Sequence, residues 1–118
     1  MTFEPRSMVL RSSEFGSTQG LIRPADGVAP DDHRYRAAMI QHILARYVNQ
    51  GVRSRGLSMT SFIATVGEIP GMTADRQRRI MRGETAATFG DFAFWVAEFP
   101  KAAVEISKYF EHWDRGAR

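Results

Sequence analysis

The 118-residue sequence contains no cysteine and no long apolar run. The lack of cysteine excludes a disulfide framework, a cysteine-based zinc or iron–sulfur site and a thiol nucleophile, and it fits a reducing cytoplasm. The longest apolar stretch, residues 92–97, is far shorter than the roughly 18 to 20 residues that cross a bilayer, and no basic start leads into a signal segment. We therefore expect a soluble, unexported cytoplasmic protein without membrane contact, built as one domain with a tail.

Lysine is also scarce. The formal net charge is +3, and only Lys101 and Lys108 among the 16 basic residues are lysines. Residues 1–30 are neutral, residues 31–82 carry nine arginines against four acidic residues, and the remainder is slightly acidic. The planar fork of arginine suits phosphate groups and base edges, although the base composition of a genome explains an arginine bias equally well. Base composition does not explain why the arginines cluster, so the cluster favours a polyanionic partner.

Glycine and proline interrupt residues 1–30 so often that neither a helical nor a strand period survives. We therefore predict a flexible or irregular N-terminal arm over residues 1–30, in which residues 7–11 could pair as a short strand. Three roles stay open for this arm: disorder, a strand exchanged in a dimer, and a minor-groove reader that uses Arg6 or Arg11.

From residue 31 onward apolar residues recur at helical spacing. Ser58, Thr73 and Thr88 are the expected N-caps, and Gly51 is the expected end of the first helix. The fold class is therefore all-α, with a helical domain over residues 31–118. Its five helices are expected at about 33–50, 58–66 and 74–82, then from Thr88, and at about 101–114. The fourth is expected to bury Phe89, Phe92, Ala93, Val96 and Phe99.

The pair of short helices carries a resemblance. Residues 57–67 followed by 72–83 resemble the helix-turn-helix of lambda-repressor-like (XRE/Cro-type) DNA-binding domains: Gly67 matches the turn glycine, Thr73 the cap of the recognition helix, and residues 80–83 its close. The resemblance covers about residues 34–100. Three features depart from the family pattern: residues 68–71 lengthen the turn, Gln77 replaces an apolar residue, and Ile63 stands where the family prefers alanine for close helix packing. The second departure predicts either a half-buried polar side chain or a rotated recognition helix.

The resemblance implies a sequence-specific double-stranded DNA-binding transcriptional regulator, such as a repressor, a phage-type regulator or an antitoxin, whose helix 74–82 reads the major groove. A helical protein-interaction module, an adaptor or inhibitor built on the same scaffold, is the alternative. Position by position, the resemblance directs Ala74, Asp75, Arg76 and Arg79 toward base edges. It places Thr73, Arg78 and Arg82, with Arg53 and Arg55 of the preceding loop, near phosphates. Asp75 has a second interpretation as a residue that stabilises the helix N-terminus.

The last helix carries an aromatic stripe that is either core or a self-association face. A homodimer is common in the resembled family, so the possible dimer face is Ile106, Tyr109, Phe110 and Trp113. His33, His42 and His112 are scattered without metal-site spacing, and no serine or threonine has an evident His/Asp partner. We therefore expect no metal, no cofactor and no enzymatic activity.

Overall fold

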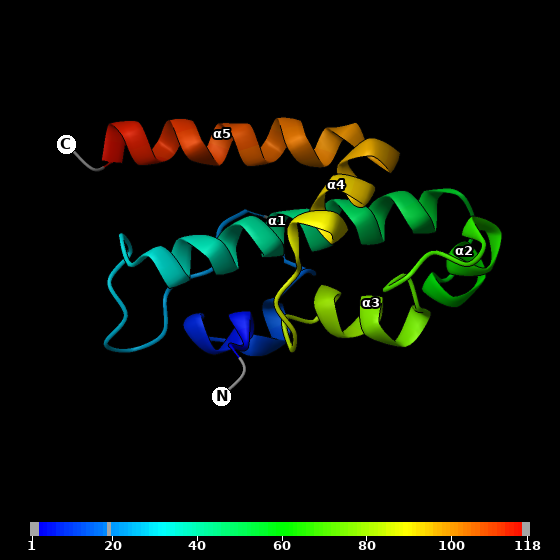
Figure 1. The fold of residues 1–118 in the computed structure, drawn as a ribbon. Coiled ribbons are helices and arrows are strands. Elements are labelled where there is room, and N and C mark those ends of the chain that lie inside the picture. Colours follow the sequence, from blue (N-terminus) through cyan, green and yellow to red (C-terminus); the bar gives the residue numbers. More distant parts are fainter. Residues whose placement is uncertain (1–2, 19, 117–118) are drawn as a thin grey trace.

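The computed structural model describes residues 3–18 and 20–116, with side chains up to residue 113 (Figure 1). In this part of the chain all regular elements are helices, and an isolated bridge between Val9 and Pro24 is the one strand-like pairing. The all-α class predicted from the sequence is therefore confirmed. Two 3-10 helices, η1 (Pro5–Met8) and η2 (Ser12–Glu14), precede α1 (His33–Ser54), α2 (Met59–Val66), α3 (Ala74–Met81), α4 (Phe89–Glu98) and α5 (Pro100–Gly116).

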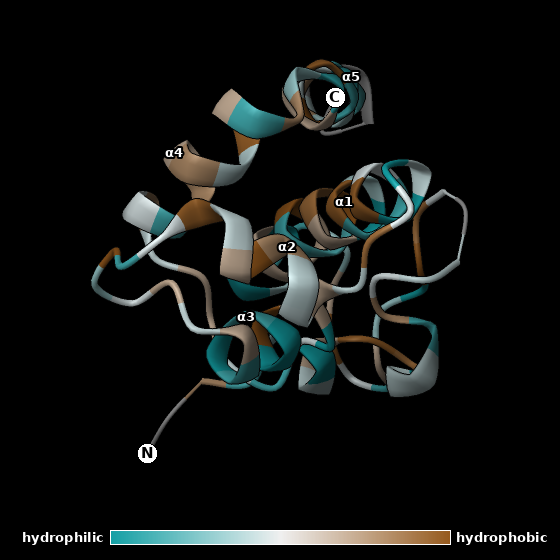
Figure 2. Cartoon of the chain, turned by 90° about the vertical axis from the view of Figure 1, so that its right-hand side faces the viewer, coloured by the Kyte–Doolittle hydropathy of each residue, from teal (hydrophilic) through white to brown (hydrophobic). Residues whose placement is uncertain are grey.

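The long helix α1 is the centre of the fold. It contacts each of the other four α-helices and η1. In Figure 1, α5 runs along one side of α1, whereas α3 and the 3-10 helices lie on the opposite side. Figure 2 shows α3 as a largely hydrophilic helix at the edge of the molecule. Within the described residues, no helix combines the length and the apolar character needed to cross a membrane.

The predicted N-caps are confirmed. The side chains of Ser58 and Thr88 each accept a hydrogen bond from a backbone N–H three residues on, and each completes a capping box with Ser61 and Asp91, respectively. Thr73 accepts in the same way from the N–H of Arg76, at 3.3 Å. These interactions are local in sequence, which is why the residue pattern could predict them.

The predicted stop at Gly51 is wrong, because α1 continues through it to Ser54. Gly51 instead allows a close approach of α4: a Cβ atom there would lie 2.4 Å from Cδ1 of Phe99. The Phe99 ring is itself held in place, since it stacks on Trp95 and lies under the guanidinium of Arg55. The glycine therefore serves helix packing and not helix termination.

The apolar face predicted for α4 is also displaced. Phe89 is 96% exposed and Ala93 is exposed, whereas the fully buried residues of this helix are Asp91 and Trp95. Phe92, Val96 and Phe99 are half-buried. Polar contacts from α3 to Asp91 and Trp95 set this orientation, and the hydrophobic spacing carries no information about them.

Apart from η1, η2 and the bridge at Val9, residues 3–18 and 20–30 are irregular, and they pack onto the helices. Val9, Phe15 and Ile22 belong to the buried core, and the hydroxyl of Tyr35 donates a hydrogen bond to the Ile22 carbonyl. The strand considered for residues 7–11 is reduced to the bridge at Val9, where the Leu10 N–H donates to the Arg23 carbonyl at 2.9 Å. This N-terminal segment is therefore part of the domain in the structure.

The close approach at Gly51 gives a stability prediction. Gly51→Ala is expected to destabilise the fold by about 1 to 3 kcal/mol, because the added methyl group overpacks against the Phe99 ring. Gly90→Ala in α4 is the matched control: its Cβ would meet only Thr88 Oγ1, at 3.6 Å, so stability stays the same or rises slightly. Urea unfolding of both variants measures the difference, and equal midpoints would contradict the packing role of Gly51.

Candidate nucleic-acid interface

The helices α2 and α3 and the segment between them form the region that the sequence singled out. The connection, residues 67–73, turns at Gly67 and Gly71, both with positive φ, and the Met72 N–H donates to the Ile69 carbonyl at 3.0 Å. Met72 is buried. The long connection is therefore an ordered turn that is anchored to the core.

Gln77 lies on the inner side of α3 and is completely buried, with no exposed surface. Its Nε2 donates to Asp91 Oδ1 at 3.0 Å and to the Gly71 carbonyl at 3.3 Å, and its Oε1 accepts from the indole N–H of Trp95 at 2.8 Å. Of the two outcomes expected from the sequence, the half-buried glutamine is wrong, because the side chain is fully buried. The amide is buried and fully paired, so it costs little to bury and it fixes the rotation of α3 about its axis.

Arg76 also points inward. Its guanidinium makes a bidentate pair with Asp91, at 2.6 and 2.7 Å, and a further bond to the Gly71 carbonyl at 3.0 Å. Burial by itself raises the pKa of Asp91, but hydrogen bonds from Arg76, from the Thr88 N–H and from Gln77 outweigh it and lower the pKa to about 2. The sequence-based assignment of Arg76 to base edges is therefore corrected: the side chain positions α3 against α4.

The outer face of α3 carries the remaining arginines. Arg79 pairs with Asp75 one turn earlier at 3.3 Å, and both side chains are at least half exposed. Arg78 donates to Thr60 Oγ1 of α2 at 2.5 Å. Arg82 is 64% exposed and lies 3.7 Å from Glu84. The structure thus brings Arg78, Arg79 and Arg82 together at one surface, next to exposed Asp75 and half-buried Ala74.

The two arginines before α2 differ in their surroundings. Arg55 pairs with Glu98 at 3.1 Å and its guanidinium lies over the Phe99 ring, so it links the end of α1 to α4. Arg53 is exposed, and its side chain makes no ion pair with any residue that the structure describes. Of the pair, Arg53 has the freer side chain for a phosphate.

Three of the four residues considered for a dimer face take part in intramolecular packing. Ile106 and Tyr109 are buried in the core, and Trp113 is half-buried with the Arg36 guanidinium 4.8 Å from its ring centre. Phe110 alone is exposed, and it lines an apolar groove of about 450 Å³ together with Phe89 and Phe92. Sequence reasoning missed this groove, because Phe89 occupies a position that the helical spacing assigns to the core.

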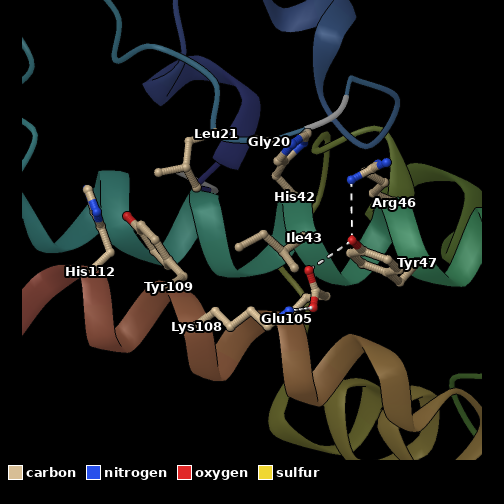
Figure 3. A pocket seen from close by; sticks show the side chains of 10 residues that line it. All are labelled: Gly20, Leu21, His42, Ile43, Arg46, Tyr47, Glu105, Lys108, Tyr109 and His112. Atoms are coloured by element: carbon tan, nitrogen blue, oxygen red, sulfur yellow. Dashed lines mark hydrogen bonds and ion pairs between the residues drawn. The ribbon is translucent and has the colours of Figure 1, made fainter.

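A second hollow lies between α1 and α5, next to Gly20 and Leu21 (Figure 3). Its polar groups satisfy one another: Tyr47 donates to Glu105 at 3.2 Å, and Lys108 pairs with Glu105 at 2.7 Å. His42 points toward Gly20, with its Nε2 2.9 Å from the Gly20 carbonyl. Among the described residues, no three or more histidine, aspartate and glutamate side chains form a group that could hold a metal ion.

Comparison of the chain with family models, with curated proteins and with solved structures gave no match.

The Asp91 network gives the first prediction for this region. Arg76→Ala is expected to lower the free energy of unfolding by about 3 kcal/mol, because it leaves a buried carboxylate without its cation. Arg79→Ala, which removes an exposed pair on the same helix, should cost about 0.5 kcal/mol or less. Urea unfolding at pH 7 measures both. The contribution of Asp91 is present at neutral pH and is lost as the pH falls from about 4 toward 2. If Arg76→Ala and Arg79→Ala lose similar amounts of unfolding free energy at pH 7, the inward role of Arg76 is contradicted.

The buried histidine gives the second prediction. The Gly16 N–H donates to His42 Nδ1 at 2.8 Å, so the ring is neutral with its proton on Nε2, and burial lowers its pKa. The folded state then binds fewer protons than the unfolded state, so stability is complete above about pH 6.5 and falls as the pH decreases below that value. His42→Gln should remove this loss, whereas His112→Gln on the exposed side of α5 should retain it. Unfolding midpoints across pH 5 to 8 make the comparison, and a loss that survives in His42→Gln would rule this histidine out as its source.

Proposed function

We propose that this chain is a sequence-specific double-stranded DNA-binding protein of the lambda-repressor-like helix-turn-helix type, a transcriptional regulator such as a repressor, a phage-type regulator or an antitoxin. In this proposal α3 enters the major groove, and the protein acts in the cytoplasm as a homodimer, without a cofactor and without enzymatic activity. The observation that carries the proposal is the division of α3 into two sides. Its inner polar residues, Arg76 and Gln77, are paired, while Arg78, Arg79 and Arg82 face outward.

A helix that reads the major groove must hold its contacting side chains in a fixed position. The paired residues on the inner side of α3 fix its rotation, and this division therefore suits a recognition helix. Arg79 is the candidate for a guanine edge, and Asp75 beside it is a candidate acceptor for a cytosine amino group. Arg78 and Arg82 flank this position and suit phosphates, as does Arg53. Their charge would supply most of the affinity, while Arg79 would supply sequence preference.

The apolar groove favours the second candidate function. A side chain as large and as exposed as Phe89 beside a groove of this size is typical of protein contact surfaces. In this alternative the chain is an adaptor or inhibitor that binds a protein partner. The two candidates respond differently to salt, because only binding to a polyanion releases many counterions.

Selection from a pool of random duplexes, followed by titration of the enriched duplex, tests the DNA proposal. Arg79→Ala is expected to reduce the preference for the enriched duplex over random DNA by about 1 to 3 kcal/mol. Arg82→Ala is expected to weaken binding to both duplexes equally and to reduce the salt slope by about 1. Lys101→Ala, which removes one charge from α5, is the control and should change neither. If no duplex is enriched, or if affinity does not depend on salt, the DNA proposal fails and the protein-partner candidate is favoured.

A further inference from the structure

A third hollow, of about 250 Å³, lies where the N-terminal segment meets α1, α2 and α3. Its polar lining consists of Ser13, Ser17, Asn49, Arg78 and Arg82. In the described part of the chain, none of the residues that line it is acidic. The hollow adjoins the outer face of α3, because Arg78 and Arg82 belong to both.

The two arginines lie one helical turn apart, so their guanidinium groups can reach one bound group from the same side. Arg78 is held by its bond to Thr60, which occupies one of the five N–H groups of the guanidinium. Among the described residues, the one ion pair of Arg82 is a long contact with Glu84, at 3.7 Å, and its side chain is 64% exposed. The two side chains therefore offer several donors and two positive charges to the hollow.

The opposite wall of the hollow is ordered by backbone contacts. The one proton of the Ser17 hydroxyl is shared between the carbonyls of Ser13 and Glu14, at 3.3 and 3.1 Å, and Asn49 Nδ2 lies 3.5 Å from the Gly16 carbonyl. A Cβ atom on Gly16 would lie 2.4 Å from the Met81 carbonyl, so this loop and the end of α3 are in direct contact. The N-terminal segment is thus placed as a fixed wall opposite the arginines.

We propose that this hollow binds one phosphate group, held by Arg78 and Arg82 and bounded by Ser13 and Ser17. A pair of arginines suits a phosphate because it matches the several oxygen acceptors with charge-assisted donors, and the Ser13 hydroxyl at the rim is a further donor. Where the bound group is a backbone phosphate of DNA, the inference rests on the proposed function. The N-terminal segment is then part of the DNA-binding surface. A phosphorylated small molecule would present the same chemistry.

Ser13→Asp and Ser12→Asp form a matched pair for the test in the full-length chain. Both serines are exposed in η2 and gain the same charge, but only Ser13 lines the hollow. The first probe is inorganic phosphate, titrated at constant ionic strength while the amide resonances of residues 13–17 and the Nε–H resonances of Arg78 and Arg82 are followed by NMR. The second probe is a short random-sequence duplex.

We expect saturable shifts with inorganic phosphate that Ser13→Asp abolishes and Ser12→Asp retains. We also expect Ser13→Asp to bind the duplex about tenfold more weakly than Ser12→Asp, as for the loss of one charge-assisted hydrogen bond. Arg82→Gln, an exposed substitution that spares the fold, should abolish the phosphate shifts and lower the salt slope for the duplex by about 0.9.

The outcomes separate the site from the proposed function. If phosphate binds as expected but no duplex does, the hollow is a site for a phosphorylated small molecule and the DNA proposal is overturned. If the duplex binds equally to the two aspartate variants and phosphate causes no saturable shift, the site is overturned and the DNA proposal stands. If neither inorganic phosphate nor the duplex binds, the phosphate site and the DNA proposal are both overturned.

Discussion

The buried carboxylate of Asp91 determines how α3 sits on the rest of the protein. It caps α4 through Thr88 and accepts hydrogen bonds from Arg76 and Gln77 of α3, while Gln77 also pairs with Trp95. A carboxylate removed from water is costly unless it is fully paired. A rotation of α3 about its axis would break these bonds together, so the network selects one rotational position of the helix. The outward direction of the remaining arginines follows from that position.

The degree to which the outer arginines of α3 are ordered before a ligand binds affects the cost of binding. A surface arginine loses conformational entropy when a ligand orders it, and part of this cost is avoided where the side chain is already held. Arg78 is held by Thr60, whereas Arg79 has only a weak exposed pair with Asp75 and Arg82 is the most exposed of the three. The face therefore combines one arginine in a defined position with two that can adapt. The DNA proposal draws on this combination, because a duplex presents its phosphates at regular intervals.

The sequence predicted the parts of the fold that depend on neighbouring residues. The caps at Ser58, Thr73 and Thr88 are contacts over three residues, and the all-α class follows from helical spacing. The failures are contacts between distant segments. The helix end predicted at Gly51 is wrong because the role of this glycine depends on its contact with Phe99. The direction of Arg76 depends on Asp91, fifteen residues later, and a sequence pattern for capping gives no sign that the same carboxylate binds an arginine of another helix.

The first turn of α4 connects the two exposed surfaces of the molecule. Phe89, beside the apolar groove, and Asp91, which holds α3, lie two residues apart on opposite sides of that turn. The same turn of α4 therefore lines the groove with Phe89 and orients α3 through Asp91. The helical spacing of Phe89 predicted burial, yet the burial of Asp91 in the same turn requires Phe89 to point away from it. The exposure of this phenylalanine is thus a direct consequence of the polar network that orients α3.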